Sequence, residues 1–173
     1  MSDPKSDPNN YVTLWAAVAG GMLSAIGGFF AVVMRGRMDK RAEIDYIKTA
    51  LIDELSEICS IIDKLAETCK ATHIIANNYF TDLEFNNQSF NYHKLRLFLI
   101  KKAEIRKGIS TFYKELSELT NDSKNRVGQL GISEAARNEQ NDAIAVKFGK
   151  IKTDAEALMK ELKVYKYKVF YWI

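Results

Sequence analysis

The side chains best suited to metal binding or nucleophilic catalysis in this sequence are two cysteines and two histidines. Cys59 and Cys69 lack the close spacing of zinc ligands. Neither His73 nor His93 is part of a Glu-x-x-His pair of the kind that holds a diiron centre. The sequence also lacks a P-loop, a dinucleotide-binding glycine pattern and a Gly-x-Ser-x-Gly turn. We therefore expect no metal, no cofactor and no catalytic residue, and we predict that the protein is not an enzyme.

The spacing of the two cysteines bears on whether their domain lies in a reducing or an oxidising compartment. On one helix, their separation of ten positions puts the α-carbons about 15 Å apart, which is too far for a disulfide bond within the chain. We expect reduced, packed thiols in a cytosolic domain, with a bridge between two copies as the alternative. Asp53, Glu54 and Glu57 gather near one face of the same expected helix, and we interpret them as a solvated acidic face rather than an active site.

A charge-free apolar segment covers residues 11–34, and its 24 residues exceed the roughly 20 that a helix needs to cross a bilayer. Tyr11 and Trp15 lie at its start, where aromatic rings suit the membrane interface. A cleaved signal peptide would have its basic residues before a shorter apolar core. We therefore predict a retained transmembrane helix at residues 11–34, preceded by a disordered N-terminus at residues 1–10.

Basic residues follow this segment directly. Residues 35–43 form a juxtamembrane segment in which only Asp39 and Glu43 are acidic. Because basic residues stay on the cytoplasmic side, we predict a single-pass protein of the inner (plasma) membrane with its N-terminus outside and its C-terminus in the cytoplasm. The side chains expected to bind anionic lipid headgroups are Arg35, Arg37, Lys40 and Arg41.

Small residues recur every four positions within the apolar segment. Such rows let two helix backbones approach closely, which predicts homo-oligomerisation or packing on another membrane protein. The alternative is that glycine and alanine are simply common in membrane helices. The first row is Ala16, Gly20, Ser24 and Gly28, and the second is Ala17, Gly21 and Ala25.

Apolar residues in the remaining body, residues 44–173, recur at alternating spacings of three and four. This period is helical and resembles that of coiled coils, so we predict an all-α fold in which the transmembrane helix is followed by an antiparallel bundle of about three long helices. Residues 77–93 and 120–133 lack the pattern and are expected to form loops, with Ser133 as an N-cap. The three stripes are Ile44, Leu51, Leu55, Ile58, Ile62, Leu65 and Cys69; Leu95, Phe98, Ile105, Ile109, Phe112, Leu116 and Leu119; and Ile144, Phe148, Ile151, Ala155, Leu158, Leu162, Tyr165 and Val169.

The charge of the body gives little reason to expect nucleic-acid binding. From Arg35 onward the chain carries 24 basic and 20 acidic residues, a net charge too small to indicate such a partner. A local basic cluster on the second expected helix is either a solvated face or a site for an anionic partner. Its members are Lys94, Arg96, Lys101, Lys102, Arg106 and Lys107.

The C-terminal tail, KVYKYKVFYWI, combines aromatic and basic residues. Three roles remain open for it: capping the bundle against residues 77–87, contacting a partner protein, or contacting the membrane. With three helical passes the tail would lie far from the bilayer, which argues against membrane contact. The residues proposed for a partner contact are Tyr167, Phe170, Tyr171 and Ile173.

The anchor, the basic residues after it, the long helix containing ALIDELSEICSIIDKL and the later ISTFYKEL together resemble uncharacterised small bacterial single-pass membrane proteins with helical cytosolic domains. Some of that group occur in phage-defence or mobile-element settings. The resemblance implies the architecture and carries no functional residue over. We expect a membrane-anchored helical scaffold or sensor that oligomerises and engages an unknown cytosolic protein. The alternative is a membrane-perturbing effector or small oligomeric pore gated by the bundle.

Overall fold

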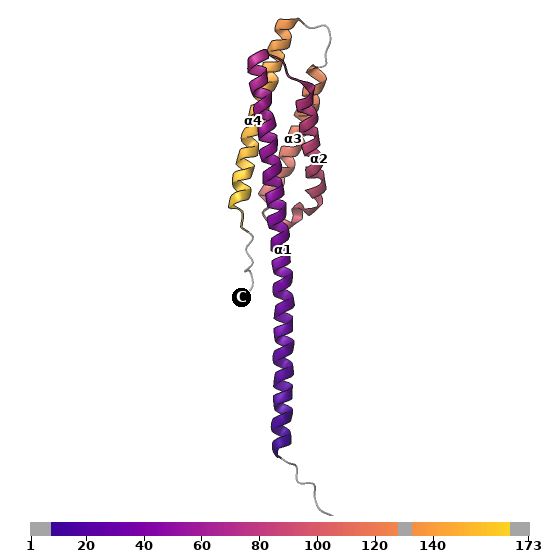
Figure 1. Ribbon diagram of the computed structural model, residues 1–173, viewed down its shortest axis with the longest axis vertical. Coiled ribbons are helices and arrows are strands. Elements are labelled where there is room, and N and C mark those ends of the chain that lie inside the picture. The colour runs from indigo at the N-terminus through magenta and orange to yellow at the C-terminus, as the bar shows by residue number, and fades with distance from the viewer. Residues whose placement is uncertain (1–7, 128–132, 167–173) are drawn as a thin grey trace, which may run out of the picture. The chain divides into compact units, whose positions relative to one another are not determined.

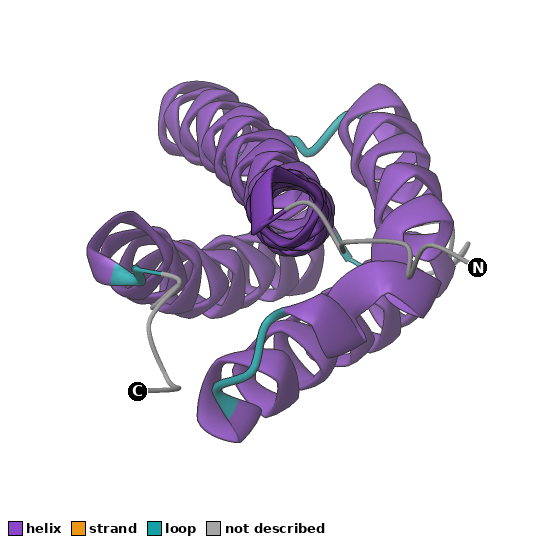
Figure 2. Ribbon diagram, turned by 90° about the horizontal axis from the view of Figure 1, so that it is seen from below, coloured by secondary structure: helices purple, strands orange, loops and turns teal. Residues whose placement is uncertain are grey.

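The computed structural model describes the backbone of residues 8–127 and 133–166. Every regular element in this described part is a helix, and Figure 2 shows no strand among them, so the all-α prediction is confirmed. The chain divides into two units between Ala42 and Glu43. In chain order the elements are α1 (Pro8–Thr72), α2 (Asn77–His93), the 3-10 helix η1 (Lys94–Leu99), α3 (Ala103–Val127) and α4 (Glu134–Val164).

The part of α1 after Ala42 buries the predicted apolar stripe. Side chains at i, i+3, i+4 and i+7 lie on one face of an α-helix, and here that face forms one side of the core. The helix ends at Thr72, where His73 adopts a positive φ of 54° and its backbone N–H donates to the carbonyl of Cys69 at 2.7 Å. The stripe residues that are buried on α1 are Ile44, Leu51, Leu55, Ile58, Ile62, Leu65 and Cys69.

The prediction that residues 77–93 form a loop is wrong, because they form α2. Phe80, Leu83 and Phe90 face inward and are buried. The inward position between Leu83 and Phe90 is occupied by Asn86, which is also buried and whose side-chain amide donates to the carbonyl of Asp82 at 3.0 Å. Because Asn86 is polar, the apolar residues of this segment do not show a helical period in the sequence. The local hydrogen bond of its amide allows the helix to bury it.

The second predicted stripe begins later than expected. Leu95 and Phe98 belong to η1 and are exposed, whereas burial on α3 starts at Ile105. At its other end, α3 continues to Val127 through residues that we expected to form a loop. The buried stripe residues of α3 are Ile105, Ile109, Phe112 and Leu116, with Leu119 partly buried.

The fourth helix begins and ends at clear boundaries. Ser133 is its N-cap, as predicted, and its hydroxyl accepts from the backbone N–H of Ala136 at 3.3 Å. The helix ends at Val164, and Tyr165, its C-cap, is no longer helical. The predicted stripe is buried at Ile144, Phe148, Ile151, Ala155, Leu158 and Leu162. Val169 lies outside the described residues.

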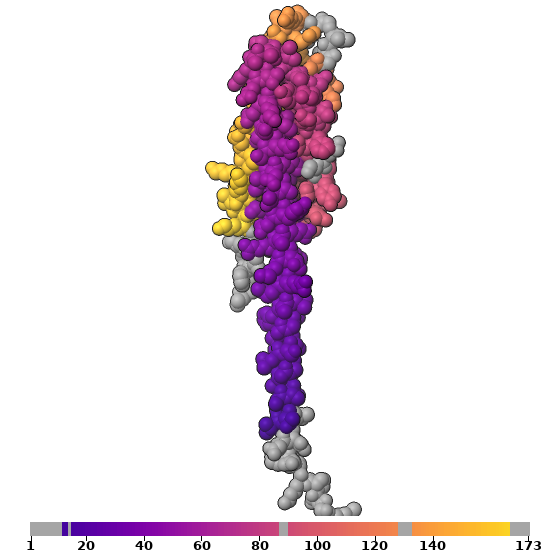
Figure 3. All heavy atoms as spheres, in the orientation of Figure 1, coloured from indigo at the N-terminus to yellow at the C-terminus, as the bar shows by residue number. Residues whose placement is uncertain are grey.

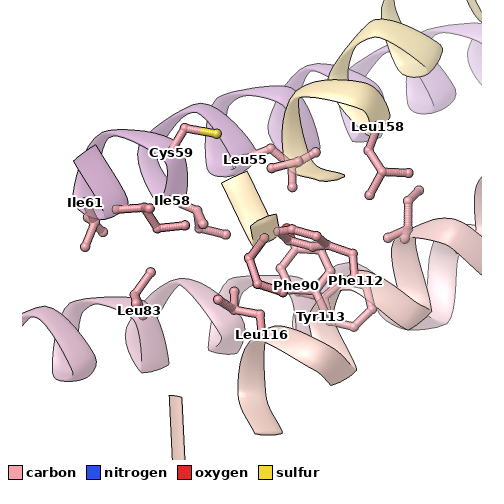
Figure 4. Packing of buried hydrophobic residues seen from close by; sticks show 14 of the residues in the cluster. Leu55, Ile58, Cys59, Ile61, Leu83, Phe90, Phe112, Tyr113, Leu116 and Leu158 are labelled. Carbon is pink, nitrogen blue, oxygen red and sulfur yellow. The ribbon is translucent and has the colours of Figure 1, made fainter. Parts of the chain in front are cut away.

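One hydrophobic core joins the second unit. Figure 4 shows Leu55 and Ile58 of α1, Leu83 of α2 and Leu116 of α3 pointing into the same interior. The rings of Phe90 and Tyr113 stack within it, with centroids 3.9 Å apart and planes 5° from parallel. Buried side chains from α1, α2, α3 and α4 therefore stabilise each other.

The polar contacts between α1 and α4 follow a regular order. Lys48 Nζ donates to the carbonyl of Tyr165 at 2.8 Å, and Lys152 Nζ donates to Asp63 Oδ1 at 2.7 Å. Farther along α1, Nδ1 of His73 lies 3.2 Å from Asp142 Oδ1. As the residue number rises on α1, its partner's number falls on α4, and Figure 3 shows α4 lying against this part of α1. The end of α4 therefore lies beside the beginning of the second unit, as Figure 1 also shows.

Candidate functional site

The most distinctive surface of the first unit is its apolar helix. It contains an 18-residue window with a mean hydropathy of 2.0, none of which is buried. Large hydrophobic side chains such as Trp15, Leu23 and Phe29 are exposed. Within the described residues this is the one helix that is long and apolar enough to cross a membrane.

The predicted packing residues all lie on this helix. Gly20, Gly21 and Gly28 have open space where a side chain would begin, because no atom lies within 4 Å of the Cβ position. The small-residue rows are therefore not filled by a neighbouring segment of the described chain. The residues of the two rows are all exposed: Ala16, Ala17, Gly20, Gly21, Ser24, Ala25 and Gly28.

The predicted headgroup-binding residues follow on the same helix. Arg35, Lys40 and Arg41 are exposed, and Arg37 is partly exposed. A helix of this composition brings an apolar surface and cationic side chains together along a short stretch of chain. Apolar chains and anionic headgroups are the chemistry that such a surface can accommodate.

The predicted partner-contact residues Tyr167, Phe170, Tyr171 and Ile173 lie outside the described residues. The structure does fix where the tail begins. The carbonyl of Tyr165 accepts from Lys48, and its hydroxyl accepts from the backbone N–H of Lys101 at 3.0 Å. The expectation that the tail lies far from the start of the body omitted the helix α2, and the residue that follows α4 contacts Lys48, near the first residues of the second unit.

The basic cluster predicted on one helix is divided among three segments. Lys94 and Arg96 lie in η1, Lys101 and Lys102 in the connection after it, and Arg106 and Lys107 on α3. Arg106 has a structural role, because its guanidinium donates to the carbonyl of Ile100. Sequence reasoning missed that Leu95 and Phe98 are exposed among these cations.

A second group that sequence reasoning missed joins Cys69, His73 and Asp142. The Cys69 thiol donates to Asp142 Oδ1 at 3.5 Å, and His73 Nδ1 lies 3.2 Å from the same oxygen. Burial, and then the bond to Asp142, raises the pKa of Cys69 to about 11. The thiol is therefore protonated at neutral pH, which is the opposite of what a nucleophilic cysteine needs.

The same group closes the junction between α1 and α4. The side-chain amide of Asn141 donates to the backbone carbonyl of His73 at 2.8 Å, at the point where the chain adopts its positive φ. A hydrogen bond to this carbonyl satisfies a group that the end of α1 leaves without a helical partner. The arrangement is structural, and its partners are some 70 positions apart, so no spacing rule could have revealed it.

The interpretation of Glu54 as part of a solvated acidic face is wrong. Asp53 and Glu57 are exposed, but Glu54 is only 6% exposed. Burial raises the pKa of Tyr113, and the nearby Glu54 carboxylate raises it further. The period could have revealed this, since Glu54 lies three residues after Leu51 and four before Ile58, inside the apolar stripe.

No protein-family model matches this sequence, and comparisons with curated proteins and with solved structures gave no match.

Proposed function

We propose that the chain is a single-pass membrane protein whose helical body acts as an interaction module. The observation that carries the proposal is the exposed, charge-free apolar helix followed directly by a basic segment. Exposing this many large apolar side chains to water would be costly, at about 25 cal/mol for each Å² of apolar surface. A bilayer removes that cost, and the position of the basic residues favours an external N-terminus and a cytoplasmic body.

We propose further that the body is an antiparallel helical bundle. The opposing order of contacts between α1 and α4 supports this arrangement. So does the pair formed by α2 and α3, where Glu84 binds Lys124 at 3.0 Å and Phe90, farther along α2, stacks on Tyr113, which comes earlier on α3. A bundle of this kind presents long polar helix faces on a fixed core, and such faces suit the binding of another protein.

Self-association through the apolar helix completes the proposal. The two rows of small residues are unoccupied within the described chain, and a second copy of the same helix has matching rows to place against them. Association would bring several bodies close together and raise their effective concentration for a cytosolic partner. The module would then act as an anchored scaffold or sensor.

Reporter fusions test the anchor and its orientation. A phosphatase that folds only in an oxidising, external compartment is fused after Ile173 or before Met1 of the full chain and expressed in bacteria. We expect activity from the N-terminal fusion alone, in membranes that resist alkaline extraction. As a control, replacing Arg35, Arg37, Lys40 and Arg41 with glutamine should give mixed orientations. Activity from the Ile173 fusion of the unaltered chain, or release of the protein by alkali, would overturn the proposal.

A further inference from the structure

The 3-10 helix η1 has a two-sided distribution of side chains. A 3-10 helix has three residues per turn, so residues at i and i+3 lie on the same side. On one side, Leu97 and Ile100 are 5% and 0% exposed and hold the segment on the core. On the other side, Leu95 and Phe98 are 84% and 71% exposed. The segment is therefore firmly attached while presenting two large apolar side chains outward.

The other exposed side chains of η1 and of the two residues before α3 are basic. Between His93 and Ala103 the chain carries Lys94, Arg96, Lys101 and Lys102 and no acidic residue. We call the exposed side chains of Lys94, Leu95, Arg96, Phe98 and Lys102 the η1 surface. Exposed apolar side chains that stand together mark a contact rather than a solvated face. Large apolar groups interspersed with cations are typical of surfaces that lie in the headgroup region of a bilayer.

The position of η1 identifies which bilayer it can reach. Arg96 Nη1 lies 3.9 Å from Glu43 Oε1, and the rings of Tyr46 and His93 meet edge to face at 6.1 Å. The η1 surface is thus at the end of the second unit where the chain enters it. Glu43 is nine positions after Met34, so the chain between the apolar segment and the body spans at most about 30 Å.

We propose that the η1 surface docks on the anionic leaflet of the membrane that holds the apolar helix. Leu95 and Phe98 would enter the headgroup region while Lys94 and Lys102 pair with lipid phosphates. The inference rests on the proposed membrane anchor. The short chain between Met34 and Glu43 would hold the η1 surface close to the bilayer and so greatly raise the effective concentration of that surface at the membrane. Docking would give the body a preferred side toward the membrane and leave the opposite end free.

Site-directed spin labelling of the full chain tests the docking. A nitroxide is attached at Phe98→Cys, or at Val146→Cys, whose native residue is similarly exposed at 75% but lies on the part of α4 near His73. The native thiols Cys59 and Cys69 are buried, which directs the label to the added cysteine. Each variant is placed in vesicles of phosphatidylcholine alone or with 30% phosphatidylglycerol, and collisions with a water-soluble nickel chelate are measured.

We expect the anionic lipid to lower the nickel collision rate at position 98 at least threefold and to leave position 146 unchanged. Adding Lys94→Glu and Lys102→Glu should restore access at position 98, because each lysine near an anionic surface favours binding about fivefold. Equal access at positions 98 and 146 in both vesicles would overturn the docking. Protection at position 98 that does not depend on the lipid would overturn it too, since that result indicates contact with protein.

A third label separates failure of the docking from failure of the anchor. Leu23→Cys lies within the apolar helix and should be protected from nickel in both kinds of vesicle. If position 23 is protected while position 98 is not, the membrane anchor is supported and the docking of the η1 surface is refuted. If position 23 is accessible, the anchor and the docking that depends on it both fall.

Discussion

The buried pair formed by Glu54 and Tyr113 allows a quantitative test of the core. Both side chains are almost fully buried, at 6% and 2% exposed, among apolar residues of the second unit. The Tyr113→Phe substitution removes one hydroxyl and keeps the ring that stacks on Phe90. The perturbation is therefore confined to the polar interaction with the carboxylate.

The expected magnitude follows from the burial of both groups. A buried polar group that loses the polar group nearest to it keeps its desolvation cost, which is about 1–3 kcal/mol, and the electrostatic influence of Glu54 on Tyr113 indicates that the two groups lie near each other. We expect Tyr113→Phe to lower the free energy of unfolding by about 2 kcal/mol. The Glu54→Leu variant should also be destabilised. Changing both residues should cost less than the sum of the two, because an apolar pair leaves no polar group without its partner.

Urea unfolding of the full chain in detergent micelles, followed by far-ultraviolet circular dichroism, measures these values. The four proteins of the double-mutant cycle give the coupling energy between the two side chains, which we expect to be about 1–2 kcal/mol. Tyr92→Phe is the matched control. Its native residue is 72% exposed, so losing that hydroxyl should change the stability by less than about 0.5 kcal/mol.

The reasoning fails if the coupling energy is below about 0.5 kcal/mol, or if Tyr113→Phe behaves like the exposed control. Either result would mean that water or another group compensates Glu54 without the tyrosine. A destabilisation that is equally large in the presence and absence of Glu54 would attribute the effect to packing rather than to the polar pair.

Two further predictions concern the apolar helix and a buried thiol. Gly20→Ile with Gly28→Ile should convert oligomers to monomers, measured by crosslinking and by energy transfer within vesicles. Ala19→Ile with Met22→Ile should not, because the turn of about 100° per residue puts these two positions on the opposite face of the helix. Unchanged assembly of the glycine variant would refute the proposed packing through the two rows. The raised pKa of Cys69, about 11 against an ordinary 9.0, favours the protonated folded state, so its contribution to stability is present below pH 9 and lost as the pH rises to 11. Between pH 9 and pH 11 the unfolding free energy of the unaltered chain should fall by about 2 kcal/mol more than that of Cys69→Ser. Equal dependence of the unfolding free energy on pH in the two proteins would refute the raised pKa of Cys69.

The regular parts of the fold could be predicted because their burial repeats locally. Ile44 through Cys69 on α1 and Ile144 through Leu162 on α4 follow one helical period, with Glu54 as a buried polar exception on α1, and both stripes are helical and buried. The same rule placed Leu95 and Phe98 inside, where the structure exposes them. A spacing of three fits the inner and the outer side of a helical turn equally well, so the period could not decide between them.

The residues of the candidate site were predictable only where the signal was local. The apolar helix and the basic residues after it are visible in composition alone. The contacts of Asp142 with Cys69 and His73 depend on two helices meeting, and no local pattern encodes that meeting. The position of the surface around Phe98 depends on α2, because the helix leads the chain from the end of α1 back to η1, whose Arg96 lies near Glu43. The expected loop at residues 77–93 gave no such return.

The composition of α2 has a consequence for how the body opens. Five of its 17 residues are asparagine, it contains no alanine, and its inward face relies on a few large side chains such as Phe80 and Phe90. Asparagine and aromatic residues have modest helix propensity, so α2 owes its conformation to the helices against which it packs. We therefore expect α2 to have a lower local free energy of opening than α3 and α4, so its amides should exchange with solvent before theirs. Partial unfolding of the body would then begin with α2 and uncover the core from that side.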